Sequence, residues 1–414
     1  MFARSAAITL AVAVILALVC GCGGNAKDDV LEPAEEVSTR AEVPEEYRVV
    51  YDELDAKLAE LDAYLDARWD GERGDTVFSV ELITANSNRG EVLLYQETFA
   101  ACQRTLQSLH DVGVTGITLS VQYPVLNPDF PRSSEYLDFY RRLAAEVKSG
   151  GFTLIVETTT IFPEISPLGI DYAALTLDEF MREKRAMIET VLREMAPDYL
   201  TIENEPITQQ LNTGLDFSVA NQTEIVNHIL SGLDRAGARI GAGAGSWDDL
   251  AYFESLAANT DLDYLDVHFY PIQGDLVADR AERIAETARA AGKGLGVSEA
   301  WLYKTSSSEL AVGQNTAAAA GIFARDAFGF WAPLDQAFLE VMVGLSHHLE
   351  LEFFSPFWMQ YLYAYLDYDD STQGMDYAEI QRASGQKAWP NIDNGELSAT
   401  GEAYRNLISG AAGP

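Results

Sequence analysis

Basic residues are scarce in this chain. Lysine and arginine together number 28 against 64 aspartates and glutamates, which gives a formal net charge of −36. Seven of the basic residues are lysines. A surface this acidic repels phosphate backbones and anionic lipid headgroups, so we expect no nucleic-acid partner and no charge-driven membrane contact. The carboxylate excess is compatible with a saline habitat and equally with an ordinary soluble acidic protein.

Several motifs of common enzyme classes are also missing. No GxGxxG follows the first predicted strand, no Walker loop occurs, and no GxSxG stands at a strand–helix turn. These absences remove the usual grounds for a dinucleotide-binding fold or a serine hydrolase. The chain has five histidines, and of these only His268 ends a predicted strand, whereas metal-dependent barrel hydrolases use several. We therefore expect no metal and no organic cofactor.

The first 22 residues have the pattern of a targeting segment. An apolar run over residues 6–19 is too short to span a bilayer comfortably and ends at Cys20-Gly21-Cys22. Small residues before a cysteine resemble a bacterial lipoprotein signal, and Cys22 fits the lipidated position better than Cys20, which follows bulky Val19. An ordinary secretory signal or an uncleaved anchor is the alternative. We expect a signal peptide over 1–21 and a protein lipid-anchored at the bacterial cell envelope, outside the cytoplasm. After cleavage Cys102 is the one remaining thiol, so no internal disulfide can form.

The mature chain divides into three parts. Residues 22–46 lack a hydrophobic period and are rich in Gly, Glu, Pro, Ala and Asp, which is typical of a flexible acidic tether. Residues 47–75 carry leucines at helical spacing and predict one helix, packed on the bottom of the following domain. Residues 76–414 form the expected catalytic domain.

Short β-branched and aromatic runs alternate with helical patterns from residue 76 onward. We predict eight strands at 76–82, 116–121, 152–158, 199–203, 239–243, 264–269, 294–298 and 349–354. Predicted helices lie at 95–111, 134–148, 177–195, 224–236, 250–256, 278–291 and 317–346. This alternation predicts an α/β fold, a (β/α)8 TIM barrel, with an open doubly wound sheet as the alternative. A barrel gathers its chemistry at the C-terminal ends of its strands.

Those strand ends resemble glycoside hydrolase clan A, the barrel superfamily of cellulases, mannanases and galactanases. Strand four ends in Asn204-Glu205-Pro206, strand six in His268-Phe269-Tyr270, strand seven in Glu299, and strand eight is followed by Trp358. The resemblance implies that Glu205 is the acid/base and Glu299 the nucleophile of a retaining glycosidase. It also implies that Asn204 binds the sugar 2-hydroxyl and that His268 and Tyr270 orient the carboxylates.

Sugar rings pack on flat aromatic surfaces, so Trp301 and Trp358 are candidate platforms. The expected partner is a polysaccharide or oligosaccharide, bound by a monomer. The assigned family is left open, because strand two carries no arginine where many clan members have one. Strand three ends in Glu157-Thr158-Thr159 instead of the histidine of several families.

Other acidic residues compete with this pair. Strand alternation places Glu203 on the same side as Glu205, as a partner or as the true acid. Glu157, Glu81 and Asp266 are further candidates, and for Asp266 a structural role is expected. The rival functions are a catalytically silent carbohydrate-binding lipoprotein and a metal-dependent barrel hydrolase.

The lipid anchor can be tested directly. Labelled fatty acid should enter the wild-type protein and be absent from Cys22→Ala, because the lipid is attached at the cysteine. Equal label in both proteins would remove the anchor from the interpretation. Loss of label in Cys20→Ala alone would move the site by two residues.

Overall fold

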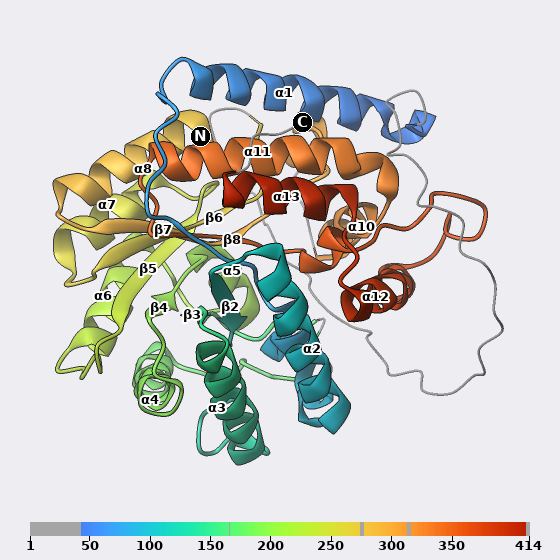
Figure 1. Cartoon of the computed structure of the whole chain (residues 1–414). Coiled ribbons are helices and arrows are strands. Elements are labelled where there is room, and N and C mark those ends of the chain that lie inside the picture. The colour runs from blue at the N-terminus through green and yellow to red at the C-terminus, as the bar shows by residue number, and fades with distance from the viewer. Residues whose placement is uncertain (1–42, 165, 274–276, 313–315, 411–414) are drawn as a thin grey trace.

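A computed structural model gives the structure of residues 43–164, 166–273, 277–312 and 316–410 (Figure 1). The predicted signal peptide, Cys22 and residues 22–42 of the predicted tether lie outside the described residues. Within the described ranges, no helix is long and apolar enough to cross a membrane.

Eight parallel strands form the centre of the molecule. They are β1 (Val77–Phe78), β2 (Gly116–Ser120), β3 (Thr153–Glu157), β4 (Tyr199–Glu203), β5 (Arg239–Gly245), β6 (Tyr264–Phe269), β7 (Gly294–Ala300) and β8 (Phe353–Pro356). From β2 to β8 each strand pairs with the next one along the chain, and β1 pairs with β8. An isolated bridge between Glu81 and Thr118 links the segment after β1 to β2. Hydrogen bonds from Thr118 N to Val80 O (2.9 Å) and from Leu82 N to Thr118 O (3.0 Å) close the ring between the first two strands. The predicted (β/α)8 barrel is therefore confirmed.

Helices surround the strands. They are α1 (Arg48–Asp66), α2 (Gln96–Val112), α3 (Ser133–Ser149), α4 (Leu177–Met195), α5 (Pro206–Thr213), α6 (Val219–Leu230), α7 (Leu250–Asn259), α8 (Ala278–Ala290), α9 (Ser307–Val312), α10 (Thr316–Arg325), α11 (Ala332–His348), α12 (Tyr377–Asn394) and α13 (Ala399–Ser409). The long predicted helix over 317–346 is two helices, because Pro333 begins a new helix at the start of α11. The last strand begins later than predicted, since residues 349–350 still belong to the turn that ends α11.

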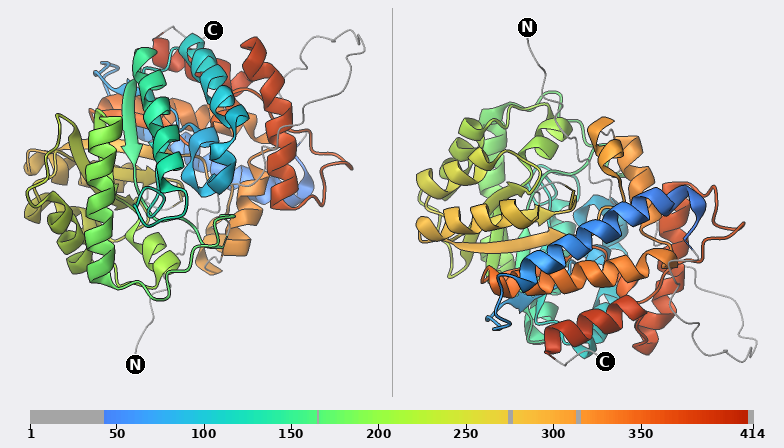
Figure 2. Two further views of the ribbon diagram at one scale, coloured as in Figure 1. Left: turned by 90° about the horizontal axis from the view of Figure 1, so that it is seen from below. Right: turned by 90° about the horizontal axis from the view of Figure 1, so that it is seen from above.

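The N-terminal helix lies in a different place from the one expected. Figure 2 shows α1 running alongside α11, outside the barrel, rather than across its bottom. Tyr51 stacks on Trp331 near one end of this contact, with ring centroids 5.7 Å apart. Leu65 lies against Gly344 near the other end, where a Cβ on that glycine would come within 2.4 Å of the leucine side chain. The leucine stripe thus buries itself against a helix of the outer layer.

The barrel interior is layered. At the bottom, Ile155, Tyr264 and Phe353 form a small apolar cluster separate from the main core. The inner face of β5 is made of glycines, and a Cβ on Gly241 would overlap the Tyr264 ring, so the missing side chain makes room for the aromatic residue. Above this layer the interior becomes polar, with Ser79 hydrogen-bonded to Thr118 and Thr201 to Asp266. The apolar floor therefore supports a polar upper half.

Glu203 points out of this interior, contrary to the strand alternation we expected. The pairing of β4 with β5 shifts register between Thr201 and Glu203, which is a β-bulge. The Glu203 carboxylate instead meets Lys184 of α4 at 3.0 Å, and both side chains are completely buried. Burial lowers the pKa of Lys184 and raises that of Glu203, and the attraction between the two partners opposes both shifts.

This buried ion pair generates a stability prediction. Lys184→Met should destabilise the fold by about 3–5 kcal/mol, because it leaves Glu203 charged and buried without its cation. The double variant Lys184→Met/Glu203→Gln should recover much of this loss. Urea unfolding followed by circular dichroism measures both values. If Lys184→Met were as stable as wild type, the ion pair between Lys184 and Glu203 would not hold α4 on the barrel.

Candidate active site

The predicted strand-end residues meet around one imidazole. His268 on β6 is 1% exposed. Its Nδ1 lies 2.8 Å from Glu205 Oε1 and 3.8 Å from Glu299 Oε2. Its Nε2 lies 2.9 Å from Ser298 Oγ and 3.2 Å from Glu157 Oε2. Within the described residues, the ion pairs of these three glutamates all go to His268.

Glu205 is held by a strained turn. It has a left-handed backbone conformation, with φ 48° and ψ 60°, directly before Pro206 opens α5. A residue with a Cβ adopts this conformation at a cost of the order of 1–3 kcal/mol, which persists only where the surroundings enforce it. Its backbone N–H donates to the Asn204 side-chain oxygen at 2.8 Å. The turn points the Glu205 carboxyl at His268 while Glu203, two residues earlier, faces outward.

A second bulge brings two consecutive residues of β7 to the same site. The pairing of β6 with β7 shifts register between Asp266 and His268. Ser298 then reaches His268 Nε2 and Asp266 Oδ2 (2.6 Å), while Glu299 accepts a hydrogen bond from the Tyr270 hydroxyl. A regular strand would have sent these neighbours to opposite faces.

Burial and like charges dominate the electrostatics. Burial raises the pKa of Glu299 well above its usual range, and the Glu157 and Glu205 carboxylates add to this effect against His268 and Tyr270, which lower it. Burial alone would lower the pKa of His268, but the Glu299, Glu157 and Glu205 carboxylates raise it well above its usual value. The imidazole is therefore positively charged near neutral pH.

A fourth carboxyl, Glu81, lies just outside this ring of contacts. It follows β1, accepts a hydrogen bond from Asn86 Nδ2 at 2.8 Å, and has no partner for its buried Oε2. Burial, with Glu157 and Glu299 nearby, raises its pKa well above the ordinary value. Asp266 likewise has a raised pKa from burial, although Thr201 and Ser298 donate hydrogen bonds to it. Asp266 thus holds its neighbours in place, as its expected structural role requires.

The spacing of three side chains would suit a small cation. Glu157, His268 and Glu299 each present a ligand atom within 4.8 Å of the others. However, both ring nitrogens of His268 face carboxylate oxygens, so a metal ion would have to displace a ring proton before it could bind there. The arrangement suits proton transfer better than metal binding.

The pocket next to His268 and its carboxyl partners is lined in part by residues that the sequence analysis does not predict. It is lined by Asn86, Asn88, Ser120, Gln122, Thr159, Phe162, Glu205, His268, Glu299 and Phe357. Asn88 belongs to a 3-10 segment (Ser87–Leu94) after β1 that has no regular hydrophobic period, and Asn86 caps the start of that segment. Gln122 lies two residues beyond the end of β2. Phe357 is the immediate neighbour of the predicted platform Trp358.

The two predicted tryptophan platforms are buried. Trp301 and Trp358 are almost wholly inaccessible, and both pack near Tyr361. Lys304, on the loop after β7, lies over the Trp301 ring at 5.2 Å and makes a buried ion pair with Asp326 at 2.8 Å. The aromatic rings that line the described pocket are those of Phe162 and Phe357. A direct sugar contact by either tryptophan stays a prediction.

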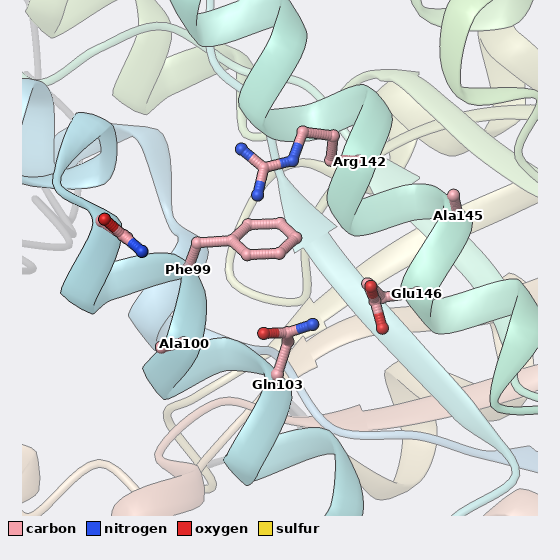
Figure 3. A pocket seen from close by; sticks show the side chains of 7 residues that line it. Phe99, Ala100, Gln103, Arg142, Ala145 and Glu146 are labelled. Atoms are coloured by element: carbon pink, nitrogen blue, oxygen red, sulfur yellow. The ribbon is translucent and has the colours of Figure 1, made fainter.

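A separate hollow lies on the outer surface between α2 and α3 (Figure 3). Arg142 stands over the Phe99 ring at 4.0 Å, with Gln103 and Glu146 along the rim. The hollow contains no residue from a strand end. Its lining therefore lacks the acid pairs that the barrel interior provides.

No family model matches the chain, and no curated protein matches its sequence. Solved structures share its fold. A GH5_18 from Bifidobacterium longum subsp. infantis has 12% identity and a TM-score of 0.52, covering 81% of this chain and 79% of that one. A GH5_18 variant from Bifidobacterium longum subsp. longum, solved with Manβ1-4GlcNAc, has 11% identity and a TM-score of 0.51, covering 81% and 78%. The AHE enzyme from Alicyclobacillus herbarius has 11% identity and a TM-score of 0.50, covering 84% and 99%. The barrel architecture implied by the clan resemblance is confirmed by these likenesses.

Proposed function

We propose that this protein is a retaining glycoside hydrolase that cleaves O-glycosidic bonds in an oligosaccharide or polysaccharide. The observation that carries the proposal is the meeting of Glu205 and Glu299, from the ends of β4 and β7, on one nitrogen of His268. Glycosidic cleavage needs a protonated carboxyl for the leaving oxygen and a carboxylate for the sugar carbon. A fold shared with GH5_18 proteins, one solved with a disaccharide, supports the same substrate class.

The separation of the two carboxyls favours retention. Their nearest oxygens lie 2.8 and 3.8 Å from the same nitrogen, so they are no farther apart than these two distances together. Retaining enzymes hold the two carboxyls about 5–5.5 Å apart, whereas inverting ones leave about 6.5–9.5 Å for a water molecule. This upper limit on the distance between the nearest oxygens of Glu205 and Glu299 falls at the lower edge of the carboxyl separations of inverting enzymes. Direct attack by Glu299 therefore fits better than attack by an interposed water.

The proposed hydrolysis has two steps, and Glu205 and Glu299 act in both. Glu205 donates its proton to the glycosidic oxygen while Glu299 attacks the anomeric carbon, forming a glycosyl ester and releasing the aglycone. Glu205, now a carboxylate, takes a proton from water, and the hydroxide adds to the anomeric carbon and frees Glu299. Tyr270 orients Glu299 through its hydroxyl. The role proposed for Asn204, whose side-chain oxygen accepts a hydrogen bond from the Glu205 backbone N–H, is to bind the sugar 2-hydroxyl.

We further propose that the enzyme works as a monomer at the bacterial cell envelope, tethered by a lipid on Cys22. The support is the apolar run that ends at this cysteine and the acidic, period-free stretch behind it. A carbohydrate partner outside the cytoplasm is consistent with that location.

Removing the carboxyl group of Glu205 and removing that of Glu299 should affect the glycosylation and deglycosylation steps differently. Glu299→Ala should show essentially no turnover and no covalent intermediate. Glu205→Ala should lose about 10²–10⁴-fold on a substrate with a poor leaving group, yet still be glycosylated by an activated aryl glycoside that needs little protonation. Azide should rescue its second step and yield a β-glycosyl azide if the linkage is β. Mass spectrometry and proton NMR of the first-formed anomer measure both outcomes.

Glu203→Gln is the matched control for this experiment, since it removes a buried carboxylate outside the barrel interior. It should lower stability without changing the ratio of rates on the two substrates. An inverted product, or near-normal turnover by Glu299→Ala, would overturn the assignment. A wild-type protein that binds glycans but never hydrolyses them would favour the silent binding protein.

The raised pKa of Glu299 predicts an acid limit to activity. The nucleophile must be ionised, so kcat/KM should fall as pH drops through a value above the ~4.3 of an ordinary glutamate. Tyr270→Phe removes a hydrogen bond that lowers the pKa of Glu299, so the acid limb should move to higher pH. A pH–rate profile of both proteins tests the shift. An acid limb that stays in place would mean that another group controls it.

A further inference from the structure

The protons on His268 can be assigned from its neighbours. Ser298 Oγ has one hydrogen, and Asp266 Oδ2 at 2.6 Å is its nearest charged acceptor. If the Ser298 proton goes to Asp266, the contact of 2.9 Å between Ser298 Oγ and His268 Nε2 requires the hydrogen to come from the ring. Glu157 Oε2, 3.2 Å from the same nitrogen, also requires a donor there. Nε2 therefore carries a proton.

Glu157 itself is held firmly in this position. Its Oε1 accepts a hydrogen bond from Ser120 Oγ at 2.6 Å, and Gln122 Nε2 donates in turn to that serine. Its Oε2 lies 3.1 Å from Ser298 Oγ as well as facing the imidazole. Residues from β2, β3 and β7 thus fix one carboxylate against the far side of His268 from Glu205.

We propose that Glu157 is a positioning residue that keeps His268 doubly protonated, so that the Nδ1 proton binds Glu205 Oε1 and leaves Oε2 as the oxygen that carries the catalytic proton. The inference rests on the glycosidase function proposed above and deepens it. The charge needed to assist Glu205 is supplied by an imidazolium, which a carboxylate from β3 maintains.

The consequence for the proton transfer follows. Glu205 Oε2 delivers its proton to the leaving glycosidic oxygen, and negative charge appears on the carboxyl group. The charged donor on Nδ1 is already 2.8 Å from Oε1, so it stabilises that charge as it forms. In the second step a proton from water returns to Oε2. His268 keeps both of its protons throughout.

Other charged groups also act on His268. The Glu205 and Glu299 carboxylates face Nδ1, and Asp266 acts through Ser298. Glu81 after β1 and Asp248 after β5 interact with it through space. Of all these groups, Glu157 is the one that contacts Nε2 directly as an ion pair. Its removal should therefore change the imidazole directly, and it should also lower the pKa of Glu299, which the Glu157 carboxylate raises.

The test compares wild type with Glu157→Gln and Glu157→Asp. Glutamine keeps the shape and removes the charge, so the pKa of His268 should fall. The basic limb of the kcat/KM profile should then move to lower pH. On a poor leaving group the loss should be about tenfold or more, and it should not exceed the usual worth of general-acid help, which is about 10²–10⁴-fold. Turnover of an activated aryl glycoside should change little, and Glu157→Asp should recover part of the loss.

NMR of the imidazole nitrogens gives a readout independent of activity. The chain has five histidines, and the His268 signals are identified by their absence in His268→Gln. An unchanged His268 titration in Glu157→Gln, or equal losses on both substrates, would overturn the proposal and leave Glu157 a structural residue. If wild type cleaves no glycoside, or does so without needing Glu205 and Glu299, the proposed function fails instead. The NMR titration separates these two failures.

Discussion

One imidazolium held among three carboxylates is the interaction on which the rest of the site depends. His268 touches Glu157, Glu205 and Glu299, which come from the ends of three different strands. Without a positive charge between them, three buried carboxylates would repel one another, and some would take up protons. With it, each of the three carboxyl groups has a positively charged partner. The barrel supplies this convergence because parallel strands all end on the same face.

Irregular strand pairing positions the side chains of that charged cluster. Bulges in β4 and β7 separate Glu203 from the interior and bring Ser298 and Glu299 into it together. The left-handed turn at Glu205 then aims the acid at the imidazole. The apolar floor of Ile155, Tyr264 and Phe353 keeps the bottom of the barrel packed, so these distortions are confined to the catalytic end.

Much of the architecture was predictable because strand and helix periods differ so clearly. Helix α4 has the bounds that its pattern indicated, and the strand-end motifs identified His268 and both candidate catalytic glutamates. Period alone cannot reveal a bulge, so Glu203 was assigned to the wrong side. The lining residues Asn86 and Gln122 were missed, since an irregular loop carries no pattern. The sequence does not reveal the role of Glu157 beside His268, because the two residues are far apart in the chain and meet only in the folded structure.

The seam of the barrel joins the two ends of the domain. Strand β1 pairs with β8 across most of the chain, and the Tyr404 hydroxyl of α13 donates to the Ser79 carbonyl at 2.8 Å. Contacts between residues so distant in sequence form late, since loop-closure entropy opposes them until much of the chain is in place. During synthesis β1 therefore cannot pair with β8 until the chain through β8 has left the ribosome. A nascent chain that stops before α13 would also lack the hydrogen bond from Tyr404 to the segment after β1.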